Sequence, residues 1–121
     1  MILENQKKHM INGQLIPNLI TNDKILLAFN SLNREDFLTP YTKSIAYIDD
    51  HIFIKNRFLL KPYYIAKILT FMQIDKKKEI LAVGCGSGYS SIIFGKFFKS
   101  IVSVEEDIAL IKIFREYLKT N

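Results

Sequence analysis

Cysteine is almost absent from this sequence, in which Cys85 is the only one among 121 residues. No internal disulfide can form, and a reducing compartment is the simplest expectation, so we expect a cytoplasmic protein. Long apolar runs are also absent, because Lys96 and Lys99 interrupt the longest candidate well short of the roughly 20 residues that a membrane span requires. The N-terminal stretch MILENQKKHM lacks the apolar core of a secretory signal. We therefore expect no membrane partner.

Repeats, low-complexity segments and linkers rich in proline and glycine are missing as well. Hydrophobic residues make up 49% of the chain and charged residues 24%, a composition typical of globular proteins and unlike that of disordered or fibrous ones. We expect a single domain spanning 1–121, with a helical or irregular N-terminal region over 1–60 and the start of an α/β sheet over 61–121.

The net charge of +5 has one local concentration, at Lys76, Lys77 and Lys78. Such a cluster could contact nucleic acid or an anionic surface. No aromatic residues alternate with these lysines to stack on bases, and a solvated turn before a strand explains the cluster equally simply. Nucleic acid is therefore not the partner we expect.

The first half of the chain contains one clear helical pattern. Apolar residues recur at the spacing of one helix face, with Thr21 or Asn22 as candidate N-caps: Ile25, Ala28, Phe29 and Leu32. Pro40 marks a break, and the segment 45–60 shows no clean period of either kind.

The second half alternates between helix and strand. Pro62 suits the first turn of a helix that we expect to end near Ile74. After it come a short apolar strand, a helix, a strand of β-branched residues and a helix with a strong apolar stripe: Glu79–Val83, Tyr89–Phe98, Ile101–Val104 and the stripe Leu110, Ile113, Phe114, Tyr117 and Leu118. This order predicts parallel strands joined by right-handed crossovers.

A glycine loop follows the first of these strands. Gly84, Gly86 and Gly88 lie where the strand ends and the helix begins, which is where open α/β sheets bind ligands. Glycine accepts positive φ and lets backbone N–H groups approach a ligand closely. The pattern is GxGxG instead of the dinucleotide pattern GxGxxG, and no lysine follows as a phosphate-binding P-loop would require.

An acidic cluster follows the second strand. Glu105 lies roughly 20 residues beyond the first glycine, a distance that places its carboxylate at the tip of the neighbouring strand, within reach of ribose hydroxyls. Acidic residues are also favoured at a helix N-terminus. Both explanations can hold together, with Glu105 facing a ligand and Asp107 capping the helix.

The loop and the following acid resemble those of the S-adenosylmethionine-dependent methyltransferases, which have a Rossmann-like class I fold. The upstream segment from His9 to Asp49 resembles more specifically the protein-L-isoaspartate O-methyltransferases, through Gln14-Leu15, the helix at Asp23, Arg34-Glu35-Asp36-Phe37 and Ala46-Tyr47. Lys61-Pro62-Tyr63 and the helix after it continue the resemblance. It implies S-adenosyl-L-methionine as cofactor, with these binding residues: Gly84, Cys85, Gly86, Ser87, Gly88 and Glu105.

The resemblance implies transfer of a methyl group to the α-carboxyl of an isoaspartyl residue, a protein-repair reaction whose partner is a protein or peptide carboxylate. Three features depart from the family pattern: two residues and the length of the chain. Leu60 stands where the family has a serine near the substrate, and Ala82 stands where many methyltransferases have an acid. Arg57 lies in the same divergent stretch and could form a two-pronged pair with a carboxylate.

The sequence assigns no catalytic residue. Cys85 has no histidine near it in the sequence and is expected to fill space instead of acting as a nucleophile. His9 and His51 are isolated, so no metal site is expected.

The third departure is length, because the family's sheet continues on the far side of the first strand. The expectation is a truncated, incomplete methyltransferase domain in which the edge of Ile80–Val83 is free for self-association. Methyl transfer could then be weak or absent, leaving a non-catalytic remnant or cofactor-binding module as the main alternative. A fragment of a nucleic-acid methyltransferase is a minor alternative.

Overall fold

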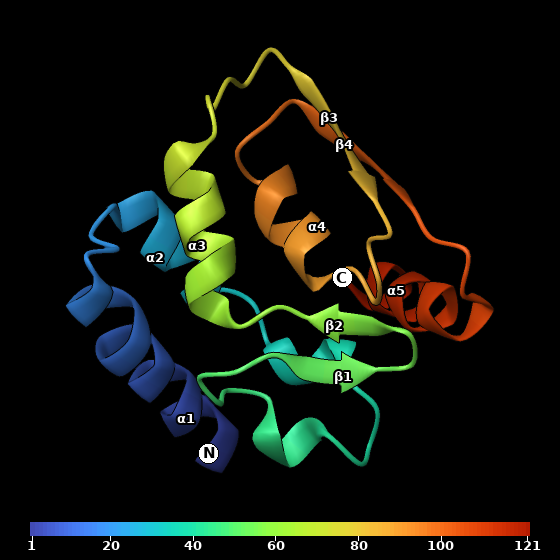
Figure 1. Cartoon of the computed structure of the whole chain (residues 1–121), viewed down its shortest axis with the longest axis horizontal. Helices are drawn as coiled ribbons and strands as arrows, with labels where there is room; N and C mark the ends of the chain where they lie inside the picture. Colours follow the sequence, from blue (N-terminus) through green and yellow to red (C-terminus); the bar gives the residue numbers. More distant parts are fainter.

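The first part of the chain is built from short helices. The computed structural model describes residues 1–121, and Figure 1 shows α1 (Ile2–Met10) and α2 (Asp23–Asn30) packed at one side of the molecule. A π-helical segment, Ile11–Leu15, and a 3-10 helical segment, Ile16–Asn18, join them. The Asn22 side chain accepts hydrogen bonds from the backbone N–H groups of Lys24 and Ile25, which confirms the predicted N-cap of α2.

A β-hairpin lies in the segment where the sequence showed no period. It consists of β1 (Ile52–Ile54) and β2 (Arg57–Leu59), paired antiparallel with Ile52 opposite Leu59. Lys55 occupies the turn with a φ of 55°. The region 1–60, expected to be helical or irregular, therefore also contains strand. The hairpin matters for the site because β2 begins with Arg57.

The α/β part follows the predicted order of elements. It comprises α3 (Pro62–Phe71), β3 (Glu79–Val83), α4 (Tyr89–Gly95), β4 (Ser100–Val104) and α5 (Ile108–Thr120). The strands β3 and β4 pair in parallel with Val83 opposite Val104, so both end at the same edge. The α/β fold class is confirmed. The helices α3 and α4 end three residues earlier than predicted, at Phe71 and Gly95.

A buried arginine ties the segments around the core together. Arg34 is fully buried and donates hydrogen bonds to the carbonyl oxygens of Ala46, at 2.6 Å, and Leu60, at 2.8 Å. Its guanidinium also lies over the ring of Tyr89, with 4.9 Å between Cζ and the ring centroid. Burial lowers the pKa of Arg34. The start of α4 and the end of the hairpin are thus held against the same side chain.

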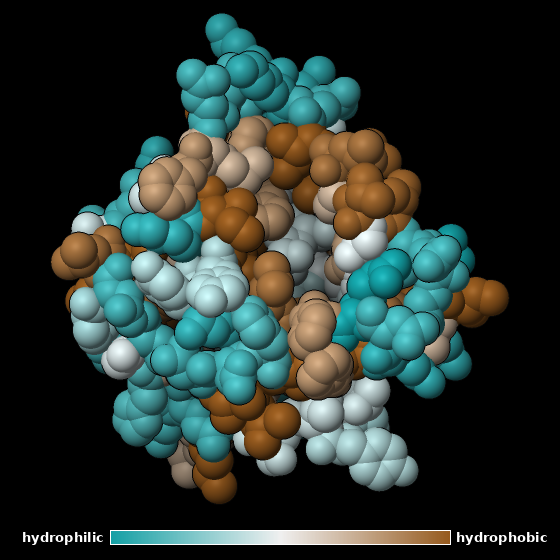
Figure 2. All heavy atoms as spheres, in the orientation of Figure 1, coloured by the Kyte–Doolittle hydropathy of each residue, from teal (hydrophilic) through white to brown (hydrophobic).

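One face of the small sheet is covered and the other is not. Ile80 and Ala82 point toward the helices, whereas Leu81 is 64% exposed and Val83 is 77% exposed. Figure 2 shows apolar side chains gathered over the part of the molecule where Figure 1 places β3 and β4. None of the helices combines the length and the apolar character needed to cross a membrane.

Candidate functional site

The glycine loop leaves β3 in a conformation that suits glycine. Gly84, Gly86 and Gly88 all have positive φ, at 68°, 61° and 99°. The backbone N–H groups of Gly84 and Cys85 both donate to the carbonyl oxygen of Val104, at 2.9 and 3.1 Å. The loop is therefore held against the end of β4, which brings the glycines next to the acid that follows that strand.

Gly88 differs from the other two glycines in what covers it. A Cβ built at Gly88 would lie only 2.3 Å from Cδ2 of Phe114, so the ring on α5 occupies the space of the missing side chain. The backbone at Gly88 also begins α4. Helix packing alone therefore explains a glycine here, whatever the loop binds.

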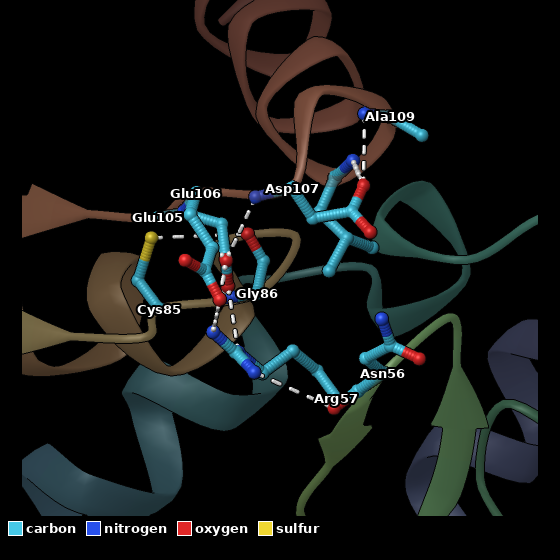
Figure 3. A network of polar contacts seen from close by, with 9 residues as sticks. Asn56, Arg57, Cys85, Gly86, Glu105, Glu106, Asp107 and Ala109 are labelled. Atoms are coloured by element: carbon cyan, nitrogen blue, oxygen red, sulfur yellow. Dashed lines mark hydrogen bonds and ion pairs between the residues drawn. The ribbon is translucent and has the colours of Figure 1, made fainter.

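Glu105 is the best-connected carboxylate of the chain. Its side chain is only 1% exposed. It accepts hydrogen bonds from the backbone N–H groups of Gly86 at 2.9 Å, Glu106 at 2.8 Å and Asp107 at 3.1 Å. Figure 3 shows these bonds converging on the carboxylate between the loop and the start of α5.

Arg57 supplies two further bonds to the same carboxylate. Its Nε donates to Oε1 of Glu105 at 3.0 Å and its Nη2 to Oε2 at 3.2 Å, the two-pronged geometry that arginine and carboxylate favour. The arginine reaches across from the hairpin (Figure 3). The sequence indicated that Arg57 could pair with a carboxylate but not that this carboxylate is Glu105, which lies 48 positions later.

These contacts keep Glu105 ionised. Burial of the carboxyl group opposes ionisation, but the backbone N–H groups of Asp107 and Gly86, the Arg57 side chain and the N–H of Glu106 outweigh it and lower the pKa of Glu105. The thiol of Cys85 responds in the opposite direction, because burial and the Glu105 charge raise its pKa. A raised pKa leaves less of the reactive thiolate at neutral pH.

A surface hollow lies beside this network. It has a volume of about 430 Å³ and is lined by Arg57, Val83, Gly84, Val104, Glu105 and Glu106. Backbone of the loop and a buried, ionised carboxylate therefore meet one accessible space. An ionised carboxylate beside glycine backbone that carries no side chain is the combination expected at a nucleoside site.

The predicted binding residues divide into three groups. The hollow is lined by Gly84 and Glu105, whereas the half-buried Cys85 lines a second hollow together with residues of α5. Gly86, Ser87 and Gly88 are buried instead, and the Ser87 hydroxyl has no hydrogen-bond partner.

Asp107 takes the other role expected of the acidic cluster. Its side chain accepts from the backbone N–H groups of Ala109 and Leu110 and so caps α5. Figure 3 shows this cap directly beside Glu105. The predicted cap by Asp107 is thus confirmed, and the ligand contact expected of Glu105 stays a prediction.

The two positions that depart from the family pattern lie in β3 and just after β2. Ala82 is half-buried in β3, two residues before Gly84. Leu60 is half-buried after β2, and its carbonyl oxygen accepts from Arg34. Neither side chain can form a hydrogen bond, so each position contributes shape alone.

Comparisons with known proteins agree with this geometry. A family profile described as protein-L-isoaspartate(D-aspartate) O-methyltransferase matches residues 5–121. A protein-L-isoaspartate O-methyltransferase of Helicobacter pylori is 28% identical over 115 residues, which are 94% of this chain and 55% of the relative. One from Herpetosiphon aurantiacus is 26% identical over 110 residues, covering 90% of this chain and 49% of the relative. The chain spans about half the length of the curated relatives it matches.

Solved structures share the fold. A protein-L-isoaspartate O-methyltransferase superposes with a TM-score of 0.73 at 22% identity, over 94% of this chain and 38% of that one. A Plasmodium falciparum protein described as an enzyme of the same kind, solved with S-adenosyl-L-homocysteine, also has a TM-score of 0.73, at 18% identity, over 98% of this chain and 55% of that one. Because the family profile extends over nearly all of the sequence, the chain belongs to the protein-L-isoaspartate(D-aspartate) O-methyltransferase family.

Proposed function

We propose that this chain binds S-adenosyl-L-methionine at the hollow beside the glycine loop and takes part in methyl transfer to the carboxyl group of isoaspartyl residues in proteins. The observation that carries the proposal is Glu105, a buried carboxylate with a lowered pKa at the end of β4, held 2.9 Å from the loop by the N–H of Gly86. Relatives of about twice the length carry the name of this activity.

The residues fit a nucleoside on their own chemistry. Glu105 would accept hydrogen bonds from the ribose hydroxyls, and the open backbone of Gly84 would lie against the rest of the ligand. The three heavy atoms nearest to a Cβ built at Gly84 all belong to the Arg57 side chain, so a movable side chain is what first meets that approach. Cys85, Gly86, Ser87 and Gly88 complete the proposed binding loop, with the last three shaping it from the buried side.

When bound, S-adenosyl-L-methionine supplies an activated methyl group. The acceptor carboxylate is already a nucleophile, so the protein's contribution would be to align the two groups and exclude water. No side chain of this chain is assigned a proton-transfer step, and Leu60, which has no donor, contributes only an apolar wall.

A second candidate is cofactor binding without turnover. Leu60 favours it, because this side chain cannot donate the hydrogen bond to substrate that the resemblance implies for a serine there. The exposed Leu81 and Val83 also favour an interaction of β3 with another surface, and we infer that two copies of the chain associate through this face.

The decisive experiment pairs binding with turnover. Calorimetry with S-adenosylhomocysteine should show binding that Glu105→Gln weakens about 10- to 100-fold, because an ionised acceptor contributes about 1.5–3 kcal/mol. Glu116→Gln, which changes an exposed carboxylate on α5, is the matched control and should bind as the wild type does. Equal affinity in the wild type and Glu105→Gln would show that the site is elsewhere.

Turnover is measured as methanol released from an isoaspartyl peptide after methyl transfer, against the same peptide containing ordinary aspartate. Release from the isoaspartyl peptide alone supports the enzyme. Binding without release supports the non-catalytic module.

A further inference from the structure

The Glu105 carboxylate has no free acceptor position. Five N–H groups donate to it: those of the Gly86, Glu106 and Asp107 backbone and two from Arg57. A carboxylate offers about four lone-pair sites. Ribose hydroxyls can therefore bind here only if an existing donor leaves.

Only the Arg57 donors are able to leave. The backbone donors are fixed, since Gly86 belongs to the loop tied to β4 and Asp107 begins the capped helix α5. Arg57 instead reaches Glu105 through a long side chain that is 31% exposed, at the start of the three-residue strand β2. Rotation of that side chain would leave three donors on about four lone-pair sites, and the freed position would be on Oε1, where only the N–H of Gly86 would remain.

The same side chain also covers the loop. A Cβ built at Gly84 would lie 3.4 Å from Nε of Arg57 and 3.6 Å from Nη2, and one at Gly86 would lie 3.8 Å from Cβ of Arg57. The guanidinium therefore lies against the space beside Gly84 into which a side chain would project and through which the ligand would approach. One residue thus blocks both the acid and the loop.

We propose that Arg57 is a built-in competitor for the ribose: it closes the nucleoside site in the free protein and is displaced when the ligand's hydroxyls bind Glu105. This inference rests on the proposed function of the hollow. Glu106 offers the displaced guanidinium an alternative partner, because its Oε1 lies 3.7 Å from Nη2 of Arg57 and its side chain is 88% exposed. Only molecules in which Arg57 has left the site can bind the ligand, so the apparent dissociation constant equals the intrinsic one divided by the fraction of open molecules.

The first test removes the competitor. Arg57→Ala should bind adenosine about tenfold more tightly than the wild type, equivalent to about 1.4 kcal/mol. Arg57→Lys should fall between them, because an ammonium group lacks the two-pronged geometry. Lys112→Ala, which removes one positive charge from the exposed side of α5, should leave affinity unchanged.

The ligand provides a second control. On Arg57→Ala, 2′,3′-dideoxyadenosine should gain less than adenosine, because uncovering the loop helps both nucleosides whereas freeing Glu105 helps only the one with hydroxyls. A larger gain for adenosine supports the proposal. An equal gain for both nucleosides, or equal or weaker adenosine binding by Arg57→Ala, overturns the competition and leaves the nucleoside site in place.

The displacement can also be observed in the unsubstituted chain. Arg57 is one of only three arginines, with Arg34 and Arg115, so its Nε–H resonance can be assigned by substitution. Saturation with S-adenosylhomocysteine should move it toward the position of a solvated guanidinium, and a resonance that stays in place at saturation overturns the proposal. If no variant binds S-adenosylhomocysteine at all, the proposed function fails, and the competitor role fails with it.

Discussion

Replacing Gly88 with alanine adds one methyl group where the start of α4 meets α5. The new Cβ would lie 2.3 Å from Cδ2 and 2.4 Å from Cγ of Phe114, against an ordinary contact of 3.4–4 Å. Either the ring or the helix must therefore retreat by roughly 1 Å, and overpacking of this kind costs about 1–3 kcal/mol. The φ of 99° adds about 1–2 kcal/mol for a residue with a side chain.

The expected loss of unfolding free energy is thus about 2–5 kcal/mol, a large part of the roughly 5–15 kcal/mol typical of a domain. Urea denaturation followed by far-UV circular dichroism measures it. Gly13→Ala is the matched control, because a Cβ at Gly13 meets nothing within 4 Å and the surrounding backbone is helical, so alanine should be neutral or stabilise by up to about 1 kcal/mol.

A second substitution tests the cause. Phe114→Ala in the Gly88→Ala background removes the clash, so the double variant should be less destabilised than the sum of the two single ones. If Gly88→Ala unfolds within about 0.5 kcal/mol of the wild type, the packing explanation of Gly88 is wrong.

Three further predictions concern the neighbouring residues. The pKa of Glu105 is lowered below its ordinary 4.5, so its contribution to the free energy of unfolding is complete above pH 4.5 and is lost as the pH falls through the folded-state pKa. In an acid titration of stability, Glu105→Gln should therefore lose less unfolding free energy than the wild type does. Asp107→Ala should cost about 1 kcal/mol of unfolding free energy by removing the cap of α5, whereas Asp107→Asn should retain most of it, and urea denaturation of both checks this. Leu81→Lys should reduce self-association in sedimentation velocity, whereas Lys112→Ala should not; a wild type that stays monomeric at all concentrations would contradict the association itself.

Local patterns predicted most of the elements. The strand Glu79–Val83 has the predicted bounds, and the caps at Asn22 and Asp107 act as their sequence positions indicated. These features depend on neighbouring residues, and for that reason single-sequence reasoning found them. The hairpin was missed because each strand has three residues, too few to show alternation, and its turn is made by lysine and asparagine.

The candidate site was only partly predictable. The glycines and Glu105 were found because strand order alone places them at one edge. Two contacts could be identified only in the folded structure. Phe114 packs against Gly88, which gives that glycine a packing role, and Arg57 binds Glu105 from a hairpin that the sequence did not reveal. Contacts between residues so far apart in the sequence have no periodic signal.

The two arginines that hold the hairpin do so by different physics. Arg34 grips the carbonyl oxygen of Leu60, just after β2, from a fully buried position, so neither dissolved salt nor mild acid should loosen that end. Arg57 holds the other end of β2 through an ionic contact in which the arginine is partly exposed, so salt weakens it, whereas acid does so only at a pH below the lowered pKa of Glu105. The end of β2 at Leu59 should therefore stay fixed under conditions in which Arg57 is released from Glu105. Ionic strength should govern how often that release occurs.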